Sequence, residues 1–545
     1  MNFKESIKKF IESASANSLK NWIEELLQIN DQHSEKIERL EAQIRKLQGL
    51  PSKPKFKTKD KTSDLDDDDD SGNGKSGGEK PNKRKDAAGK NRRKKKELEV
   101  DLKEKIKVSP SELDATFQYK GTRKVVVQDI LFQRNNIEFE LEKYYSKEHG
   151  KTVEADLPPG YDGGYFGPHL IAYIKCNYYE GDVTIKKLFK ILTSIGIKIS
   201  IRQINRIIND RPDELVYEAE EARLAAIQKV NFQQIDDAGA NIFGHTSAYT
   251  TVTCNPYFTA LYTTFSKNRR NAVMALSRAK EPLYKMNLQA ILVAFTSLKS
   301  LKIQHIMEKY KGNKIYSDDE LTIFFEQVDF KKLKFKVLEN IKTAMLVGAF
   351  YDGDLGVTGK ALVSDDAPQF NNLYDDHGLC WYHELRHYKE LDPVFEEHRN
   401  ELNLFFTEVK QMYQMLKKWV QTRDNSLQDY IFTWFNKFFR EPTSYRLLNS
   451  RKKKTLEKMD KLLAPLWTRI KLPLTNNESE RDIRGKSIKK KISLFDRSRA
   501  GILARDFYIG FKETCRKNGV SFYQILLDRA QGLGKIPQLA EIING

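Results

Sequence analysis

The feature that most constrains the fold is a change in the spacing of apolar residues at Asn231, where a helical pattern gives way to one of strands. Alternating or continuous apolar runs predict strands at 232–235, 247–253, 257–265 and 361–364. Asp236 follows the first of these strands and Asp365 follows the last. Strands separated by a long helical stretch predict a mixed α/β core of the ribonuclease-H-like kind, with both aspartates at strand ends.

Acidic residues at strand ends suit phosphodiester chemistry. Two Mg²⁺ ions about 3.5–4 Å apart can activate the attacking oxygen and neutralise the leaving oxygen, and such ions prefer oxygen ligands. A third acid, Glu480, lies on a predicted helix. We therefore predict a metal-dependent polynucleotidyl transferase in which Asp236, Asp365 and Glu480 are catalytic and bind Mg²⁺ or Mn²⁺. Asp237 and Asp366 stay as alternatives to their neighbours, and any one of these acids alone is more commonly structural.

The helix that carries Glu480 is rich in basic residues. The side chains predicted to grip DNA phosphates beside the acid are Arg481, Arg484, Lys489, Lys490 and Lys491. Solvated surface is the alternative for the lysine cluster. Glu478 lies two positions before Glu480, about 200° around the helix, and should face elsewhere.

The composition favours a nucleic-acid partner. The chain has 545 residues and a formal net charge of +18, and a cation placed on a phosphate releases condensed counterions. No apolar run approaches the roughly 20 residues that a membrane-spanning helix requires. Four cysteines without paired spacing argue against a disulfide framework. We expect a cytoplasmic, nucleoid-associated protein that binds double-stranded DNA and no membrane.

The first 160 residues divide into three predicted parts. Heptad spacing from 16 to 47 predicts a coiled-coil helix within residues 1–50, through which the protein would form a homo-oligomer; a helix packed on its own domain is the alternative. Residues 51–105 carry lysine runs and an acidic tract, and predict a disordered charged linker whose basic clusters either contact DNA or are simply solvated. Residues 106–160 predict a small β-rich unit, with hairpins at 117–127 and 136–157.

Residues 161–230 predict a helical region that resembles a helix-turn-helix. A helix at 182–195, Gly196 and a second helix at 200–209 form the pair, with Ser200 as the predicted N-cap. Arg202, Gln203 and Arg206 on the second helix have side chains able to reach base edges or phosphates. A plain helical hairpin fits the same spacing.

Residues 231–500 form the predicted catalytic core, and residues 501–545 a C-terminal helical region. The long gaps between the acids predict helical insertions near 267–346 and 387–466. The second insertion carries an apolar stripe that indicates core packing, made of Phe405, Met412, Met415, Leu416 and Trp419. Cys380, His383 and His387 could present three Zn²⁺ ligands on one helix face, but no fourth ligand is evident and a structural role is the better interpretation.

Several motifs together resemble the insertion sequence 66 family of DDE transposases. They lie at 235–240, 266–269, 363–367, 380–383, 476–484 and 490–493, and the most specific is Asn-Asn-x-x-Glu-Arg-x-x-Arg at 476–484. The resemblance covers roughly residues 160–535. It implies that Asp236, Asp365 and Glu480 match the catalytic triad and that Mg²⁺ is the cofactor. This chain departs from the family in having Asp-Asp-Ala at 236–238, where Asp-Glu-Thr is usual, and in lacking the Cys-x-x-Cys zinc module of many members.

The resemblance also implies a reaction and its substrates. Hydrolysis would expose a 3′ hydroxyl at each transposon end, and that hydroxyl would then attack target DNA at the same site. Two alternatives stay open. One is a catalytically silent, transposase-derived DNA-binding and coiled-coil protein, and the other is a structure-specific nuclease that makes no joined product.

Overall fold

The structure of the protein is a computed structural model. It describes residues 130–161, 164–245 and 247–545, and before them only 28, 32, 36, 39, 40, 42–44, 46, 47, 100, 102–105, 123–125 and 127. The predicted coiled coil, charged linker and first hairpin therefore lie mostly outside the described residues and remain predictions. Leu40 and Leu47, which belong to the predicted heptads, are described and are exposed.

A five-stranded mixed sheet lies at the centre of the described chain, with the strand order β5-β4-β3-β8-β9. Its strands are β3 (Phe232–Gly239), β4 (Tyr249–Asn255), β5 (Phe258–Thr264), β8 (Ala361–Ser364) and β9 (Asp376–Leu379). The pairs β3–β4 and β4–β5 are antiparallel, whereas β3–β8 and β8–β9 are parallel. All four predicted strands are confirmed. β9 was missed because its sequence, Asp-His-Gly-Leu, has no apolar run.

β3 is longer than its apolar residues predict. It continues past Ile235 to Gly239 because β4 pairs with it along this whole length. Thr251 of β4, directly opposite Asp237, donates a hydrogen bond from its Oγ1 to the carboxylate at 2.5 Å. Asp236 therefore lies within a strand, where the side chains alternate strictly between the two faces of the sheet.

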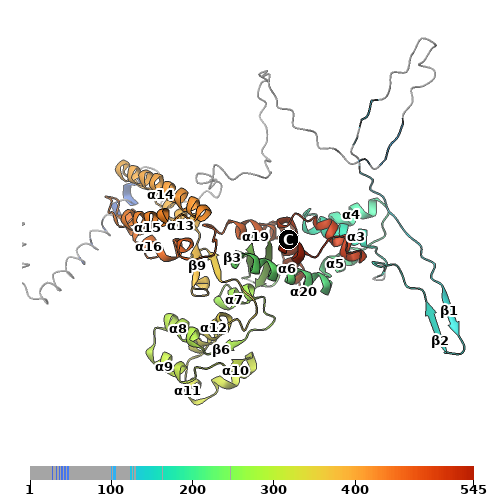
Figure 1. Cartoon of the computed structure of the whole chain (residues 1–545), viewed down its shortest axis with the longest axis horizontal. Coiled ribbons are helices and arrows are strands. Elements are labelled where there is room, and N and C mark those ends of the chain that lie inside the picture. The colour runs from blue at the N-terminus through green and yellow to red at the C-terminus, as the bar shows by residue number, and fades with distance from the viewer. Residues whose placement is uncertain are drawn as a thin grey trace, which may run out of the picture.

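Helices cover both faces of this sheet (Figure 1). On one face, α7 (Arg269–Ser277), α8 (Leu288–Leu298) and α12 (Phe335–Tyr351) share a hydrophobic core with Ile235 and Leu362. On the other face, α19 (Asn477–Ser493) contacts β3 and β4, and α20 (Arg499–Lys517) contacts β5. The predicted mixed α/β architecture with several parts is confirmed.

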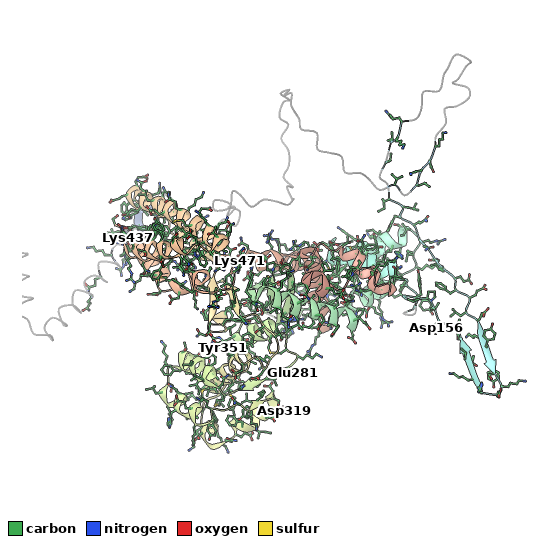
Figure 2. All side chains as sticks on the ribbon, viewed as in Figure 1. Asp156, Glu281, Asp319, Tyr351, Lys437 and Lys471 are labelled. Atoms are coloured by element: carbon green, nitrogen blue, oxygen red, sulfur yellow. The ribbon has the colours of Figure 1, made fainter. Side chains whose placement is uncertain are left out.

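Two helical lobes interrupt the sheet. The first follows β5 and adds α9 (Leu301–Lys309), α10 (Asp318–Phe325) and α11 (Val328–Lys331) to the three helices above, with a short pair β6 (Tyr284–Lys285) and β7 (Ile315–Tyr316). The second follows β9 and contains α13 (Trp381–Lys389), α14 (Glu396–Thr422), α15 (Asn425–Arg440), α16 (Arg446–Leu456), α17 (Met459–Leu462) and α18 (Ala464–Trp467). Figure 2 marks the lobes by Tyr351 and Lys437. The apolar stripe of α14 packs into the core of the second lobe, which confirms its structural interpretation.

A third helical group combines helices from residues 168–230 with helices from residues 499–544. It contains α3 (Pro168–Tyr179), α4 (Ile185–Ser194), α5 (Ile201–Asn209), α6 (Asp213–Val230), α20, α21 (Phe522–Gln531) and α22 (Leu539–Asn544), which share one hydrophobic core. The hairpin β1 (Lys143–Ser146) and β2 (Lys151–Glu154) extends away from this group (Figure 1). Among the described residues, no helix has both the length and the apolar character needed to span a bilayer.

Candidate active site

The alternation of β3 decides which side chains meet α19. Asp237 faces away from α19, and its Oδ2 accepts a hydrogen bond from Gln369 Nε2 at 2.8 Å. Gln234 faces α19, because its Nε2 donates to Glu478 Oε2 at 3.2 Å. Asp236 stands two residues after Gln234 and therefore lies on the same face of the sheet, toward α19.

The parallel pairing of β3 with β8 sets Asp365 beside Asp236. The last pair in register joins Gln234 to Val363. Continued by two residues on each strand, the same register sets Asp236 against Asp365, and neighbouring strands lie about 4.8 Å apart. Two of the predicted acids, far apart in sequence, are thus adjacent, with Asp236 inside β3 and Asp365 directly after β8.

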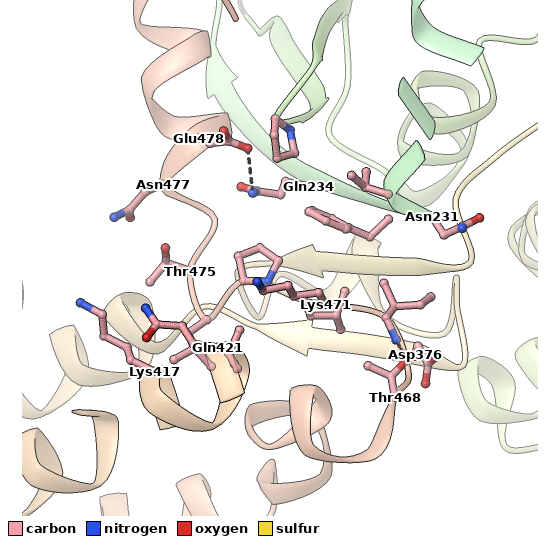
Figure 3. Close-up of a pocket in the computed structure, with 18 of the residues that line it drawn as sticks. Asn231, Gln234, Asp376, Lys417, Gln421, Thr468, Lys471, Thr475, Asn477 and Glu478 are labelled. Carbon is pink, nitrogen blue, oxygen red and sulfur yellow. Dashed lines mark hydrogen bonds between the residues drawn. The ribbon is translucent and has the colours of Figure 1, made fainter. Parts of the chain in front are cut away.

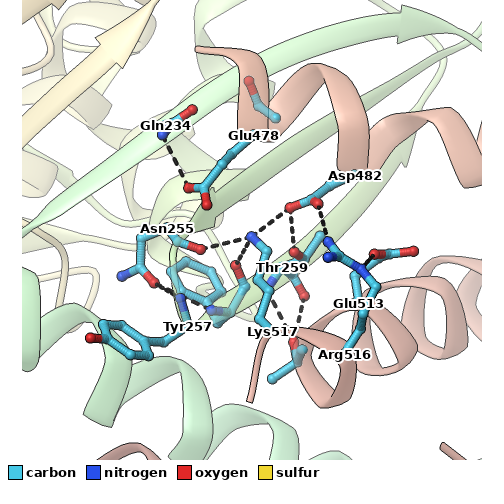
Figure 4. A network of polar contacts seen from close by, with 12 residues as sticks. Gln234, Asn255, Tyr257, Thr259, Glu478, Asp482, Glu513, Arg516 and Lys517 are labelled. Carbon is cyan, nitrogen blue, oxygen red and sulfur yellow. Dashed lines mark hydrogen bonds and ion pairs between the residues drawn. The ribbon is translucent and has the colours of Figure 1, made fainter. Parts of the chain in front are cut away.

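The buried face of α19 holds Glu480 in position over the sheet. Asp482 is buried, and its carboxylate accepts a hydrogen bond from Thr259 Oγ1 at 2.5 Å and pairs with Lys517 Nζ at 2.6 Å (Figure 4). These contacts tie α19 to β5 and α20 and so fix the rotation of the helix. Glu480, two positions earlier, is left about one-third exposed at the edge of the sheet.

Asp236 is a largely buried carboxylate beside other carboxylates. Its pKa is raised from 3.8 to about 7, and burial is the largest cause. The charges of Asp365, Glu480 and Asp237 also raise this pKa, whereas a hydrogen bond from Asp237 N to its Oδ1 at 2.8 Å lowers it. No lysine or arginine pairs with Asp236 within the described part of the chain. The three predicted acids therefore form one electrostatic cluster.

The two alternative aspartates are already neutralised by lysines. Lys267 Nζ lies 3.7 Å from Asp237 Oδ2, and Lys458 Nζ lies 2.5 Å from Asp366 Oδ2. A carboxylate with a cationic partner has less to gain from a metal ion than one without. The geometry therefore favours Asp236 and Asp365 as ligands.

The first turn of α13 adjoins this cluster. His383 Nε2 lies 3.5 Å from Glu480 Oε1, and its buried Nδ1 has no hydrogen-bond partner among the described residues. Burial raises the pKa of the Cys380 thiol to about 12, and the charges of Glu480 and Asp236 contribute to that rise. His387, one turn further along, pairs instead with a glutamate of its own helix and is nearly half exposed.

Within the described ranges, no three His, Cys, Asp or Glu side chains stand close enough together to hold a metal ion as they are. This finding covers the three acids as well as the zinc candidates Cys380, His383 and His387. The acids nevertheless supply the hard oxygen donors that Mg²⁺ prefers, and nearby Gln234 Oε1 is buried without a partner. The donor set fits Mg²⁺, whereas a thiol held protonated is a poor start for a zinc site.

The predicted pair α4 and α5 is confirmed, with Ser200 as the N-cap of α5. Gln203 takes part in a capping box, because its Oε1 accepts a hydrogen bond from Ser200 N at 2.8 Å. Arg202 and Arg206 are exposed on the same helix. These two arginines are available to a ligand, while the carbonyl oxygen of Gln203 is committed to the cap.

The basic residues of α19 have different environments. Arg481, Arg484 and Lys491 are exposed and form no ion pair among the residues that the structure describes. Lys490 is partly buried, and its Nζ donates to Gly239 O at the end of β3 at 3.0 Å.

Lys489 belongs to the interior. Its Nζ pairs with Asp182 Oδ1 at 3.2 Å and lies 4.1 Å from the centre of the Tyr178 ring, and burial lowers its pKa to about 8. The side chain is 1% exposed. Lys489 thus holds α19 against α3 in this structure and does not face a DNA-binding surface.

A groove of about 1440 Å³ begins at Glu480 and runs between the sheet and the second helical lobe. Figure 3 shows it framed by Gln234, Asn477 and Glu478 on one side and by Lys417, Gln421 and Lys471 on the other. Arg481 and Arg484 line the same groove. It connects the acid cluster with a stretch of basic surface.

The sequence did not reveal the side chains that contact Asp237 and Asp366 and so distinguish them from Asp236 and Asp365. Lys458 and Gln369 approach Asp366 and Asp237 from other elements. No local pattern indicates either contact, since each depends on how a lobe returns to the sheet. Of the side chains that contact these acids, His383 alone belongs to a motif that the sequence shows, Cys-x-x-His. The position of this motif after the second acid indicated that His383 could lie near the site.

A sheet with acids at its parallel strand ends and a basic groove beside them fits an enzyme that acts on nucleic acid. Residues 342–517 match the family described as "Transposase IS66 family", so this region is similar to a family of transposases. The resemblance predicted from the sequence is confirmed. The matched range contains Asp365 and Glu480, while Asp236 lies before it.

The chain is also similar to a protein of Sinorhizobium fredii named "Uncharacterized protein y4jO". The two are 29% identical over 310 residues, which is 56% of this chain and 93% of that protein. The similarity shows that more than half of the chain has a counterpart in another protein, without adding a function to it.

Proposed function

We propose that this protein is a DNA transposase that cleaves transposon ends by hydrolysis and then joins the 3′ hydroxyl to target DNA. The observation that carries the proposal is that the charges of Asp365 and Glu480 act on Asp236, whose pKa is raised to about 7 by burial and by these charges. The match to a transposase family over residues 342–517 supports it. The strand order, with three antiparallel and three parallel strands sharing β3, supports a ribonuclease-H-like core.

In this proposal the three acids hold Mg²⁺ through carboxylate oxygens. When bound, Mg²⁺ supplies Lewis-acid activation of the attacking oxygen and neutralises charge on the leaving oxygen. The charges that repel one another in the cluster favour cation binding, because a divalent ion removes their mutual repulsion. Glu480 is about one-third exposed and is the one of the three that lines the groove, so in this proposal it faces the incoming phosphodiester.

The chain's other residues orient the site. His383 contacts Glu480 and limits the directions in which that carboxylate can turn. Arg481 and Arg484 lie on the same helix as Glu480, line the groove, and are placed to hold phosphates on either side of the scissile bond. Arg202 and Arg206 of α5 are the proposed contacts to the DNA flank, and a homo-oligomer through residues 1–50 would bring two ends together.

Glu480→Gln tests this assignment. The expected result is loss of both cleavage and strand transfer of end-bearing DNA in Mg²⁺, by about 10³-fold or more, since one metal ligand is removed. Glu478→Gln is the matched control on the same helix, because Glu478 hydrogen-bonds Gln234 and is not part of the charge cluster at Asp236. A Glu480→Gln protein that still cut and joined DNA would refute the role of Glu480.

The separation between Asp236, Asp365 and Glu480 supports a second candidate function. Since no three ligating side chains in the described ranges are close enough to hold a metal ion as they stand, a catalytically silent DNA-binding protein is the alternative. Calorimetry with Mg²⁺ or Mn²⁺ separates the two: saturable binding that Asp236→Asn abolishes supports the enzyme, and tight DNA binding without metal uptake or cleavage supports the silent protein. Cleavage without any joined product would instead indicate a nuclease.

A further inference from the structure

The groove beside Glu480 gathers cations that have no ion-pair partner among the described residues. Five of them line it, namely Lys360, Arg469, Lys471, Arg481 and Arg484, and all five are exposed. None of the five forms an ion pair or a side-chain hydrogen bond with another described residue. They come from three different segments, the loop before β8, the loop between α18 and α19, and α19 itself, so their meeting is a product of the fold.

Other lysines and arginines near the sheet form ion pairs with buried aspartates. Lys486 pairs with Asp506 at 2.7 Å, and Lys517 pairs with Asp482 at 2.6 Å. Arg505 pairs with Asp496 at 2.8 Å. These side chains stabilise the packing of α19 and α20, whereas the groove cations form no ion pair with a described residue and repel one another, although the charge of Arg481 reaches Glu478. A polyanionic ligand is the simplest source of compensation.

The acids in the groove do not cancel this charge. Asp376 and Glu478 accept hydrogen bonds from Thr468 Oγ1 at 2.6 Å and Gln234 Nε2 at 3.2 Å and keep their charge, but the lining holds only three acids against seven lysines and arginines. Glu480 is the third acid, and it is the proposed metal ligand at the end of the groove. The net positive charge therefore lies along the path away from Glu480.

The rest of the lining suits a nucleic-acid strand. Neutral donors and acceptors are present at Asn231, Gln421, Thr475 and Asn477 (Figure 3). Trp467 lines the far end, is 46% exposed, and packs edge-on against Phe432 with 5.5 Å between ring centres. An exposed aromatic face beside a track of cations is the usual arrangement for stacking an unpaired base while the backbone is held.

The size of the groove limits what it can take. About 1440 Å³ between the sheet and the second lobe is too small to enclose both strands of a duplex over one helical turn of about 34 Å. A single strand with its phosphates on the cations fits such a space. We propose that one DNA strand, continuing from the phosphodiester held at Glu480, runs unpaired through this groove past Lys471, Arg469 and Lys360 to Trp467.

This inference rests on the proposed function, since it assigns a path to the substrate of the same site. The test compares wild-type protein with a triple variant, Lys360→Gln, Arg469→Gln and Lys471→Gln, which leaves Glu480, Arg481 and Arg484 intact. The matched control carries Lys302→Gln, Lys331→Gln and Lys336→Gln, three exposed lysines of the first lobe with no ion pair among the described residues. Equal thermal unfolding of all three proteins confirms that the changes are confined to the surface.

Binding is measured with a fluorescent duplex that carries a single-stranded extension and with the same duplex blunt. Loss of three phosphate contacts should lower the slope of log affinity against log salt by about 2 for the extended DNA, a loss of about 100-fold at 0.1 M salt. The blunt duplex and the control variant should show no such change. An unchanged slope for the extended DNA overturns the groove as a strand path, and an equal loss for the blunt duplex overturns the statement that the strand is unpaired.

A second measurement locates the strand directly. Thr475→Cys should form a disulfide by exchange with a base in the extension that carries an alkyl disulfide, whose outer thiol leaves, and Lys302→Cys on the first lobe should not. Wild-type protein that binds as expected but never cleaves, together with a Thr475→Cys variant that cross-links, would contradict the proposed function and leave the groove assignment standing. Protein that cleaves normally after the triple substitution, with unchanged binding, would contradict the groove alone.

Discussion

Asp236 should make the metal-free protein less stable as the pH rises through neutrality. Burial and the neighbouring carboxylates raise its pKa from an ordinary 3.8 to about 7 in the folded protein. Between these two pH values the folded chain holds a proton that the unfolded chain releases. The stabilisation from protonated Asp236 is therefore complete below about pH 4 and is lost as the pH rises through 7.

The size of the effect follows from the shift. One pKa unit corresponds to about 1.4 kcal/mol, so the full shift is worth about 4 kcal/mol. Across the accessible window, a group with a folded pKa of about 7 loses about 1.3 kcal/mol of stabilisation between pH 6 and pH 8. Asp236→Asn removes the titrating group and should remove this part of the pH dependence.

The assay is thermal unfolding in the presence of a chelator at pH 6 and pH 8. The Tm of Asp236→Asn minus the Tm of the wild type should be higher at pH 8 than at pH 6 by about 1–2 °C. Asp318→Asn is the control. Burial raises the pKa of Asp318, but hydrogen bonds from Lys342 and Tyr284 outweigh it and lower that pKa, so Asp318 stays ionised throughout this window. A Tm difference for Asp236→Asn that is equal at the two pH values would refute a raised pKa.

Three further predictions concern the framework that holds the site. Lys486→Met leaves two buried aspartates without their shared cation and should lower the free energy of unfolding by about 3–5 kcal/mol, measured by urea titration. Gly348→Ala sets a Cβ atom 2.5 Å from an asparagine oxygen and 2.6 Å from a backbone carbonyl, and should cost about 1–3 kcal/mol, whereas Gly312→Ala, with open space around it, should leave the Tm unchanged. Ser200→Ala removes the N-cap of α5 and should cost about 1 kcal/mol, seen as faster hydrogen exchange in that helix.

The elements that periodicity predicts are those whose own residues carry the pattern. The strand at 361–364 is apolar along its length and forms as predicted, and Ser200 caps α5 because its side chain is suited to that position. β9 and the second half of β3 contain polar residues and glycines instead. These segments are strands only because neighbouring strands pair with them, and pairing between distant segments leaves no local trace in the sequence.

Charge was harder to interpret than apolar pattern. Lys489 and Arg481 lie on one helix and look equivalent in sequence, yet Lys489 is buried against Asp182 while Arg481 is exposed in the groove. The difference depends on which face of α19 meets α3 and α20. That face is selected by buried polar partners in other elements, such as Thr259 for Asp482, which no helical periodicity of α19 itself records.

The sheet topology distinguishes Asp236 and Asp365 from their sequence neighbours Asp237 and Asp366, which the sequence alone does not do. The register that joins Gln234 to Val363 has an offset of 363 − 234 = 129 positions, and both 365 − 236 and 366 − 237 equal the same 129. Strand alternation therefore admits two matched pairs on opposite faces and disfavours a mixed pair such as Asp236 with Asp366. Glu478 contacts Gln234, so α19 covers the face of Asp236 and Asp365, and Lys267 and Lys458 neutralise the other pair. Asp236→Asn and Asp365→Asn should therefore each abolish Mg²⁺ binding, whereas Asp237→Asn and Asp366→Asn should keep it. Loss of Mg²⁺ binding only in Asp236→Asn and Asp366→Asn, or only in Asp237→Asn and Asp365→Asn, would contradict the register.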